Sequence, residues 1–489
     1  MNLDAAQIRP LLIRGAWHHA GASQFDSVNP ATGAVNYAVV AAGAEEVDAA
    51  VAAAAAAAPA WRALLPHARA RVLGRIADQI EASAEHLALA QMRENGKVLS
   101  ECRAQAGSAA AVFRYYAAVC ESVEEALTPA RGAYLALNVY EPYGVVAAIT
   151  PWNSPLTMEA QKVAPALAAG NAVILKPSEI TPTPALLLGQ AALSAGLAPG
   201  LLNVVHGSGA QTGEALLRHP GVGFVSFTGG TRSGKRVAAI AAERLLPHAL
   251  ELGGKSPHVV FADANLDAAA AAVADGIFEA SGQSCVACSR LFVQRSVYER
   301  VIGAVLARAQ ALRVDLPDTA GAQVGPIASF AQRERIEAVV TAARRDGGTI
   351  LCGGARPDAP HLAAGAFYLP TVIAGLSNAA AACQEEIFGP VLCVLPFADE
   401  DDLVAQANAS DYGLAAGVWT ANYQRALRVA RRLEAGTVWI NTYKQLSIAA
   451  PFGGFKASGV GREKGIGGMR LYQQSKSVYF GLAAPLRGD

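Results

Sequence analysis

The sequence predicts an α/β protein with two successive parallel sheets and a small β-rich arm. Three observations support this fold class. Short apolar runs rich in β-branched residues alternate with helical stretches between residues 143 and 251, and the alternation restarts beyond residue 254. Two further β-forming segments fit neither pattern. With 489 residues, the chain is long enough for two large domains and an appendage.

The first predicted sheet contains five strands with helices between them. The strands are expected at 145–150, 172–175, 202–205, 224–227 and 249–251. Helices are expected at 157–169 and 184–195, where the apolar spacing suits packing on a sheet. Ligands of parallel α/β sheets bind at the carboxyl ends of the strands. The residues that follow each strand are therefore the first candidates for a functional site.

The second predicted sheet begins after a domain boundary near residue 253. A strand at 257–261 is followed by an Ala-rich helix at 267–280, and further alternation extends to a strand at 438–440. The β-forming segments 134–140 and 476–482 lie outside both patterns. We expect these two segments to form a β-arm that pairs with a partner chain.

The composition excludes several classes of function. Forty basic side chains balance forty acidic ones, so the chain lacks the basic excess that nucleic-acid binding requires. Hydrophobic residues make up 52% and charged residues 16%, which allows a large buried core. The most apolar stretch, 49–61, is too short to span a bilayer and predicts an amphipathic surface helix. We therefore expect neither nucleic acid nor a membrane as a partner.

The cysteines and the N-terminus indicate a cytoplasmic protein. Seven cysteines are scattered through the chain, an odd number that argues for reduced thiols rather than a disulfide framework. The first eleven residues carry Asp4 and Arg9 and show no secretory signal. No second pair of Cys or His residues has the spacing of a zinc site, so no metal is expected.

Two glycine-rich loops resemble phosphate-binding motifs without matching them. Residues 229–235 read G-x-x-x-x-G-K, but Arg236 stands where a P-loop needs Ser or Thr to hold magnesium. Gly207 and Gly209 begin a dinucleotide pattern in which Thr212 replaces the third glycine. Both loops follow predicted strands and lead into helices, a place where backbone N–H groups favour phosphate. The alternative is that the glycines only make tight turns.

Cys285 is the first candidate for chemistry. It ends a Gly-Gln-Ser-Cys sequence directly after the Ala-rich helix, among small residues that leave its sulfur accessible to a substrate. The alternative is an inert buried cysteine. Cys288 completes a C-x-x-C pair, so a dithiol oxidoreductase is a further alternative, and that alternative predicts that Cys288 is essential.

Two polar residues at the ends of predicted strands support chemistry at Cys285. Asn153 follows the first strand and offers an uncharged amide donor suited to an oxyanion. Glu251 ends the last strand of the first sheet and offers a carboxylate base. Each has an ordinary alternative, a turn-forming Asn and a solvated Glu paired with Lys255. The joint occurrence of the amide, the carboxylate and the thiol favours a catalytic site.

An ordered set of motifs along almost the whole chain resembles the aldehyde dehydrogenase superfamily, in particular its hydrolytic NAD(P)-dependent members. The motifs are Asn-Pro-Ala-Thr-Gly at 29–33, Pro-Trp-Asn at 151–153, Leu-Lys-Pro-Ser-Glu at 175–179, Phe-Thr-Gly-Gly-Thr at 227–231, Glu-Leu-Gly-Gly-Lys at 251–255, the Cys285 segment, Glu-Glu-Ile-Phe-Gly-Pro at 385–390, Pro-Phe-Gly-Gly at 451–454 and Ser-Gly at 458–459. The resemblance implies that the protein oxidises a small-molecule aldehyde to a carboxylic acid.

The resemblance also implies a domain organisation. A Rossmann-like NAD-binding domain comprises residues 1–120 and 142–252, and an α/β catalytic domain comprises residues 253–457. Residues 121–141 and 473–489 form an oligomerisation arm, and residues 458–472 are a return segment. A homodimer or a homotetramer is expected.

By the same resemblance, Cys285 attacks the aldehyde carbon to give a thiohemiacetal and then a thioester. The Asn153 amide and the Cys285 backbone N–H hold the oxygen, and Glu251 activates the water that releases the acid. Lys162 and Glu463 match a pair that relays protons in some relatives, although a plain ion pair is an equal alternative. Acylating relatives pass the thioester to coenzyme A, and the presence of Glu251 favours water instead. A non-catalytic relative would lack the nucleophile, the base or the amide, and none is missing.

The resemblance favours NAD over NADP as the cofactor. Lys176 and Glu179 match residues that bind the adenosine ribose, where a carboxylate repels a 2′-phosphate. Gly230 departs from the family pattern, because many relatives have Ser there. The remaining cofactor contacts implied are Thr150, Trp152, Ser178, Gly213, Phe227, Thr228, Gly229, Gly234, Leu252, Glu386 and Phe388.

The substrate itself is not implied by the motifs. Ser154, Met158 and Gln161 match the tunnel helix, and they indicate a wider and more polar tunnel than bulky aromatic residues would leave. Lys444 matches a position near the tunnel mouth and would favour a substrate with a distal carboxylate, unless it is a solvated surface lysine. Leu446 and Phe452 complete the expected substrate contacts.

Overall fold

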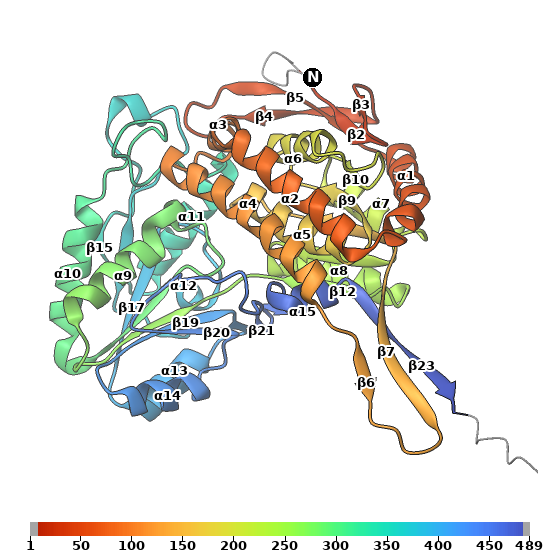
Figure 1. The fold of residues 1–489 in the computed structure, drawn as a ribbon. Helices are drawn as coiled ribbons and strands as arrows, with labels where there is room; N and C mark the ends of the chain where they lie inside the picture. The colour runs from red at the N-terminus through yellow and green to blue at the C-terminus, as the bar shows by residue number, and fades with distance from the viewer. Residues whose placement is uncertain (1–7, 483–489) are drawn as a thin grey trace, which may run out of the picture.

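Two large, mainly parallel sheets lie side by side in the computed structural model, and a thin β-arm extends from the side of the first (Figure 1). The structure describes residues 8–482. This arrangement confirms the predicted α/β class with two successive sheets. The end of the expected arm, 483–489, and the start of the expected first domain, 1–7, lie outside the described residues.

The first sheet has eight strands in the order β22-β12-β11-β8-β9-β10-β2-β3. Its five central strands are parallel, and the short β22 and β2 join its two sides antiparallel. The five predicted strands are these five, each within two residues of its expected ends. The bounds are β2 Leu11–Ile13, β3 Ala16–His18, β8 Val145–Ile149, β9 Ala172–Lys176, β10 Leu202–Val204, β11 Phe224–Thr228, β12 His248–Glu251 and β22 Gly459–Val460.

Helices cover both faces of this sheet, and their apolar sides form one core with it. The predicted surface helix begins at Ala44 and runs through Pro59 to Arg62, and it buries one side only, as an amphipathic helix does. Helix α5 is almost wholly buried. Its Lys162 is paired with Glu463, whereas the carboxyl group of Glu159 has no hydrogen-bond partner among residues 8–482. The bounds are α1 Ala44–Arg62, α2 Pro66–Ala82, α3 Ala84–Asn95, α4 Leu99–Ser122, α5 Pro155–Ala168, α6 Thr183–Ser194, α7 Glu214–Arg218 and α8 Thr231–Glu243.

The second sheet has seven strands in the order β15-β16-β17-β14-β13-β19-β20, all parallel except β15. Separate hydrophobic clusters lie on its two faces, as expected when helices cover both. The strands are β13 Pro257–Val260, β14 Arg290–Gln294, β15 Thr349–Cys352, β16 Thr371–Ala374, β17 Val391–Phe397, β19 Ala415–Trp419 and β20 Thr437–Ile440. The helices are α9 Leu266–Phe278, α10 Tyr298–Ala311, α11 Phe330–Arg345, α12 Ala381–Gln384, α13 Glu400–Asn408 and α14 Tyr423–Arg432.

The arm is a three-stranded antiparallel sheet of β6 Ala126–Thr128, β7 Tyr134–Pro142 and β23 Gln473–Gly481. Strand β23 pairs with β7 along its full length, from Gln473 opposite Pro142 to Gly481 opposite Tyr134. The two segments that were expected to pair with a partner chain therefore pair with each other within one chain. Within the described chain, β23 and β6 are the edges of this sheet.

After the second sheet the chain returns to the first. Strand β22 pairs with β12, which places Gly459 beside Glu251, and the short helix α15, Gly465–Arg470, follows. The smaller strands complete the fold: β1 Ile8–Arg9, β4 Ser23–Val28 and β5 Val35–Ala41 form one sheet, and β18 Tyr412–Gly413 pairs with β21 Phe455–Lys456. The return brings residues 452–472 to the functional edge of the first sheet.

Candidate active site

A cavity of about 620 Å³ lies at the carboxyl ends of the first sheet's strands and reaches the loop that carries Cys285. The order of the strands reverses at β8, because β9 and β10 lie on one side of it and β11 and β12 on the other. Such a switch point leaves a crevice in which α/β proteins bind ligands. The cavity is lined mainly by residues that follow β8, β9, β11 and β12, together with residues from α4, α5, α11 and the return segment.

The Cys285 loop is built from a strained turn. Ala280, Ser281 and Gly282 all have positive φ angles, between 54° and 72°. A side chain at Gly282 would meet the Gly389 carbonyl oxygen at 2.1 Å, so only glycine fits there. The Ser281 hydroxyl donates to the Gly325 carbonyl oxygen at 2.8 Å, which holds the turn in place. The strain is typical of a segment that positions a functional side chain.

Glu251 lies at the end of β12 and is buried in the same cavity. Burial, followed by the negative charge of Glu463, raises its pKa to about 8. The Cys285 thiol and the Glu251 carboxyl interact, and burial followed by the charges of Glu251 and Glu386 raises the pKa of Cys285 well above its usual value. Cys285 is therefore held as a protonated thiol in the free protein.

The loop after β12 is packed so tightly that only glycine fits. A side chain at Gly253 would meet the Glu386 carboxylate at 2.3 Å, and one at Gly254 would meet the Cys285 carbonyl oxygen at 2.5 Å. The Gly254 N–H donates to Glu386 at 3.1 Å. The Gly-Gly pair therefore brings Glu251, the Cys285 loop and Glu386 together around one cavity.

Asn153 lines the cavity beside Cys285, and its amide donates to the Gln283 carbonyl oxygen at 3.0 Å. An amide NH₂ has two donors, so one N–H is still available to a bound oxygen. Trp152, its neighbour, packs edge-to-face against Phe388 with ring centroids 5.2 Å apart. Asn153 is thus positioned by the Cys285 loop itself, which makes it suitable as an oxyanion donor.

The other end of the cavity has the features of a dinucleotide cradle. The hydroxyls of Thr150 and Thr228 are buried there without a hydrogen-bond partner among residues 8–482. Lys176 is buried, and its ammonium lies 3.7 Å from the Glu179 carboxylate, which accepts the Gly209 N–H at 3.0 Å. Partnerless polar atoms and glycine backbone at strand ends fit a polar ligand of this kind.

Most residues expected at the site line this cavity. From the cofactor set these are Thr150, Trp152, Lys176, Ser178, Glu179, Phe227, Thr228, Gly229, Gly230, Leu252, Glu386 and Phe388. From the catalytic and substrate sets they are Cys285, Glu251, Asn153, Glu463, Ser154, Met158, Gln161, Leu446 and Phe452.

Four expected residues do not line the cavity. Gly213 ends a π-helical turn, Gly209–Gly213, in which Gly209 is the residue that reaches the cavity. Gly234 lies in α8, where a side chain would meet Leu252 at 2.3 Å, so its function is close packing. Lys162 lies behind the cavity wall, fully buried, 2.6 Å from the Glu463 carboxylate and 2.9 Å from the Ser226 hydroxyl.

Lys444 is the fourth, and its expected position at the tunnel mouth needs correction. Its ammonium donates to the Glu279 carboxylate at 3.2 Å and to the Asp275 carbonyl oxygen at 3.3 Å. These partners anchor it to the end of α9, outside the cavity lining. It is neither a tunnel residue nor a freely solvated lysine.

Sequence reasoning missed several lining residues. Gln332 and Arg335 lie on α11, which has the composition of an ordinary polar surface helix, and Gln332 donates to the carbonyl oxygens of Ile387 and Phe388. Lys464 also lines the cavity. The only feature of the sequence that pointed to it was its position directly after Glu463, an expected site residue. The burial of such polar residues depends on tertiary packing that spacing along the chain does not encode.

The alternative centres do not fit the structure. Cys288 is fully buried, and its thiol donates to the Val273 carbonyl oxygen of α9 at 3.3 Å, away from any solvent-accessible surface. Residues 8–482 contain no group of His, Cys, Asp and Glu side chains that would hold a metal ion. A dithiol reaction at Cys285 and Cys288 therefore has no accessible second thiol.

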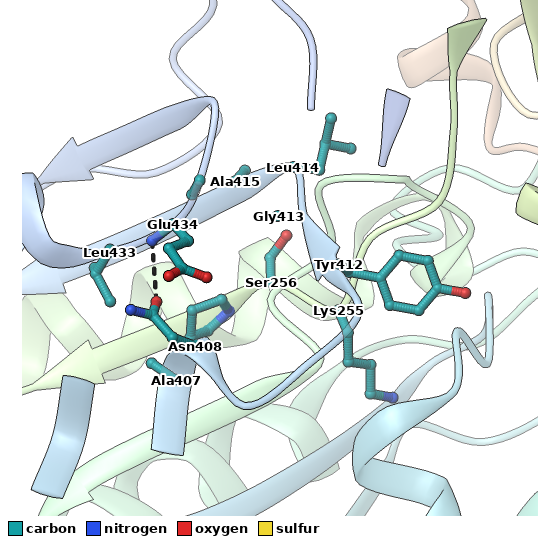
Figure 2. Close-up of a pocket in the computed structure, with 12 residues that line it drawn as sticks. Lys255, Ser256, Ala407, Asn408, Tyr412, Gly413, Leu414, Ala415, Leu433 and Glu434 are labelled. Carbon is teal, nitrogen blue, oxygen red and sulfur yellow. Dashed lines mark hydrogen bonds between the residues drawn. The ribbon is translucent and has the colours of Figure 1, made fainter. Parts of the chain in front are cut away.

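A second hollow, beside strands β13 and β19 of the second sheet, is too small for a substrate (Figure 2). Its cavity volume is about 10 Å³, roughly the space of one water molecule. Lys255 and Ser256 line it, and the Asn408 side chain accepts the Glu434 N–H at 3.0 Å. Lys255 is buried there, which excludes the solvated pair with Glu251 that the sequence allowed.

The model of the aldehyde dehydrogenase family matches residues 17–478. The chain belongs to the aldehyde dehydrogenase family. It is 40% identical over 464 residues, 94% of each chain, to a (Z)-2-((N-methylformamido)methylene)-5-hydroxybutyrolactone dehydrogenase of Acinetobacter baylyi.

Two solved aldehyde dehydrogenase-like structures have the same fold over almost their whole length. PnpE from Pseudomonas sp. WBC-3 is 38% identical with a TM-score of 0.96, and the match covers 98% of this chain and 99% of that chain. Betaine aldehyde dehydrogenase from Staphylococcus aureus, solved in complex with NAD⁺, is 35% identical with a TM-score of 0.95, over 98% and 96% of the two chains. This aldehyde dehydrogenase has no helix within residues 8–482 that is long and apolar enough to cross a membrane.

Proposed function

We propose that this protein oxidises an aldehyde to the free carboxylic acid with NAD as the hydride acceptor. The observation that carries the proposal is the meeting of Cys285, Glu251 and Asn153 in one cavity that continues into the polar cradle. A thiol, a buried carboxylate and an amide donor in this arrangement are the groups that covalent aldehyde oxidation requires.

The thiol of Cys285 is the nucleophile. After losing its proton, the sulfur adds to the aldehyde carbon, and the carbonyl oxygen becomes an oxyanion that the Asn153 amide and the Cys285 N–H stabilise. Lys464 lies near enough for its charge to favour the Cys285 thiolate, which offsets part of the effect of burial on the thiol pKa. When bound, the dinucleotide supplies the acceptor for the hydride that leaves the aldehyde carbon.

Glu251 is the base of the second half-reaction. The acyl group on Cys285 is a thioester, and the adjacent carboxylate takes a proton from water as the water attacks the acyl carbon. A buried carboxylate with a raised pKa is a stronger base than a solvated one, so its position suits this step. The presence of this base favours water over coenzyme A as the acyl acceptor.

The cradle supports NAD in preference to NADP. Thr150 and Thr228 would hold the dinucleotide through hydroxyls that lack another partner, and Lys176 and Glu179 would hold the adenosine ribose. Glu179 is half-exposed, and its carboxylate would repel a 2′-phosphate. Glu386 would hold the nicotinamide ribose, and Phe388 would flank the ring.

The test is a panel of aliphatic, aromatic, amino- and carboxy-substituted aldehydes with NAD and NADP in parallel, followed by NADH absorbance. We expect NAD-dependent turnover and a free acid as product. Cys285→Ala should abolish oxidation while NAD binding persists, and Cys288→Ala, the matched control, should retain most activity because that thiol is sealed in the core. Equal loss in both variants would support dithiol chemistry instead.

We also propose that the protein is a cytoplasmic homo-oligomer. All seven cysteines are free in the structure, as expected of a reducing compartment. Strand β23 presents one unpaired edge with Tyr479 and Phe480 exposed, and burying such an edge against a second copy would give a homodimer or a homotetramer.

A further inference from the structure

Lys464 is a buried cation at the substrate end of the cavity. Only 6% of the residue is exposed, although it lines the cavity together with Cys285 and Phe452. Its ammonium lies 4.8 Å from the centroid of the Phe452 ring. Its backbone has a φ of +63°, an uncommon value for a residue other than glycine. The side chain of Lys464 is therefore held in the cavity by a backbone conformation that is unfavourable for a residue other than glycine.

The ammonium of Lys464 has no hydrogen-bond or ion-pair partner in the described part of the chain. The carboxylate of the adjacent Glu463 forms an ion pair with Lys162 instead, whose ammonium lies 2.6 Å from it. Lys176 and Lys444 are paired, with Glu179 and Glu279, while Lys255 is also buried without a partner among residues 8–482 but does not line this cavity. A buried cation without a counter-ion is unfavourable, and an aromatic face offsets only part of the lost hydration.

The backbone fixes Lys464 beside the reacting groups. Phe452 and Glu463 exchange two backbone hydrogen bonds of 2.8 Å, which bind the return segment to the cavity wall immediately before Lys464. Burial lowers the pKa of Lys464, while the charges of Glu463, Cys285 and Glu251 act in the opposite direction. The cation thus lies close to Cys285 and to two carboxyl groups, and an additional anion would stabilise it.

This end of the cavity is also lined by the carboxyl groups of Glu251 and Glu463 and by several uncharged polar side chains. Gln105, Ser154, Thr157 and Gln161 line it, and the remaining lining cations, Lys176 and Arg335, belong to the cradle end. The uncharged side chains form hydrogen bonds without selecting a charge. Lys464 is the only cation among the described lining residues at this end, so it is the side chain there that would attract an anionic substrate.

We propose that Lys464 is a specificity-determining residue that binds a carboxylate carried by the aldehyde substrate. The inference rests on the proposed aldehyde oxidation and names its substrate class: short aldehydes with a carboxylate a few bonds from the reacting carbon. It transfers to Lys464 the carboxylate contact that the sequence suggested for Lys444, because Lys444 is held outside the cavity by Glu279.

The direct test compares two aldehydes of equal chain length, 4-oxobutanoate and butanal. We expect the wild type to have the higher kcat/KM with 4-oxobutanoate. In Lys464→Met, which keeps an apolar stem against Phe452, the ratio of the two kcat/KM values should fall about 10- to 100-fold. Lys464→Arg should retain most of the ratio. The matched control, Lys444→Met, should change it by less than about twofold, since that lysine does not line the cavity.

A binding measurement separates this proposal from the proposed reaction. Succinate should slow the alkylation of Cys285 by iodoacetamide in the wild type, followed by mass spectrometry of the Cys285 peptide, and should not do so in Lys464→Met. Butyrate should protect neither. If the wild type oxidises no aldehyde but succinate still protects Cys285, the proposed reaction is refuted and the proposed anion site is supported. An unchanged ratio in Lys464→Met, or equal loss with both aldehydes, would overturn the anion site and leave the reaction standing.

Discussion

Glu251, the proposed base, has an unusual ionisation. Burial raises its pKa to about 8, so at neutral pH most of the carboxyl is protonated and cannot accept a proton from water. A base with a raised pKa becomes active as the pH rises through that value. We expect steady-state turnover to increase with pH up to about 8 and above, with Glu251 as the titrating group.

The variant Glu251→Gln tests this assignment. The first NADH burst should persist, because removing the carboxylate also removes a charge that disfavours the Cys285 thiolate. Steady turnover should fall about 10²- to 10⁴-fold, the usual contribution of a general base, and should lose its rise near pH 8. Stopped-flow NADH absorbance separates the two phases. Unaltered steady turnover would remove Glu251 from the mechanism.

We expect Glu179 to favour NAD over NADP by its charge. Its carboxylate accepts the Gly209 N–H and faces the buried Lys176, so it is fixed at the cradle end of the cavity. In Glu179→Ala, we expect the ratio of kcat/KM with NADP to that with NAD to rise about tenfold, because a like-charge repulsion is lost. Assays with both cofactors at fixed aldehyde measure the ratio. Equal use of both cofactors by the wild type would contradict the premise.

The sequence motifs predicted the site residues that are recognisable from their position next to a strand. They missed the residues that reach the cavity only through tertiary packing. Cys285, Glu251 and Asn153 each end or follow a strand, so a strand pattern places them at one edge. Lys444 and Lys464 look alike in the sequence, and only the fold shows that one is paired with Glu279 while the other lies in the cavity.

Among the elements, α5 and the return segment are joined by a buried polar network. Lys162 of α5 contacts Glu463 and Ser226, and the Tyr472 hydroxyl donates to Ser226 at 3.0 Å. The network fixes Glu463 beside Glu251. The charge of Glu463 raises the pKa of Glu251, and the charge of Lys162 lowers it. A structural ion pair therefore also sets the electrostatics of the catalytic base.

Lys162→Met should destabilise the protein, because it leaves the Glu463 carboxylate buried without its cation. Breaking a buried ion pair in this way costs about 3–5 kcal/mol, and we expect a lower midpoint of urea unfolding followed by circular dichroism. The double variant Lys162→Met with Glu463→Gln should recover part of the loss, since the unpaired charge is gone. An unchanged midpoint with an altered pH profile of turnover would assign the pair to proton relay rather than to structure.

The strands and helices themselves were predictable where the pattern is strongly periodic. The central strands, such as β8 and β11, are continuous apolar runs between turns, and their ends agree with the sequence within two residues. The two-residue β22 was not predictable, because so short a strand has no periodicity. Its pairing with β12 is nevertheless what brings Lys464 and Glu463 to the site.

On the scale of the whole molecule, the division of labour follows the two sheets. The first supplies the cradle, the amide and the base, the second supplies the thiol through the loop before β14, and the return segment closes the cavity. The arm contributes no cavity residue and extends away from both sheets (Figure 1). The exposed apolar side chains of the arm therefore have no role in the cavity, and we expect them to serve a different purpose from catalysis.

The arm is also the expected contact between subunits of the assembly. Truncation after Gln474 removes residues 475–481 of β23, which pair with β7 from Tyr140 to Tyr134, and with them the contact between Tyr479 and Tyr134. The loss would leave β7 with an unpaired edge, and unpaired edges favour aggregation. The strand that presents Tyr479 and Phe480 to solvent, 65% and 49% exposed, would be gone as well.

We therefore expect the full-length protein to be a homo-oligomer at micromolar concentration and the truncated protein to dissociate or aggregate, as measured by light scattering. The fraction that stays soluble should still form the covalent adduct at Cys285, because every residue of the cavity lies before the cut. A monomeric full-length protein would refute the proposed assembly. An oligomer that survives truncation unchanged would show that the contact lies elsewhere, because β23 would then bury no partner surface.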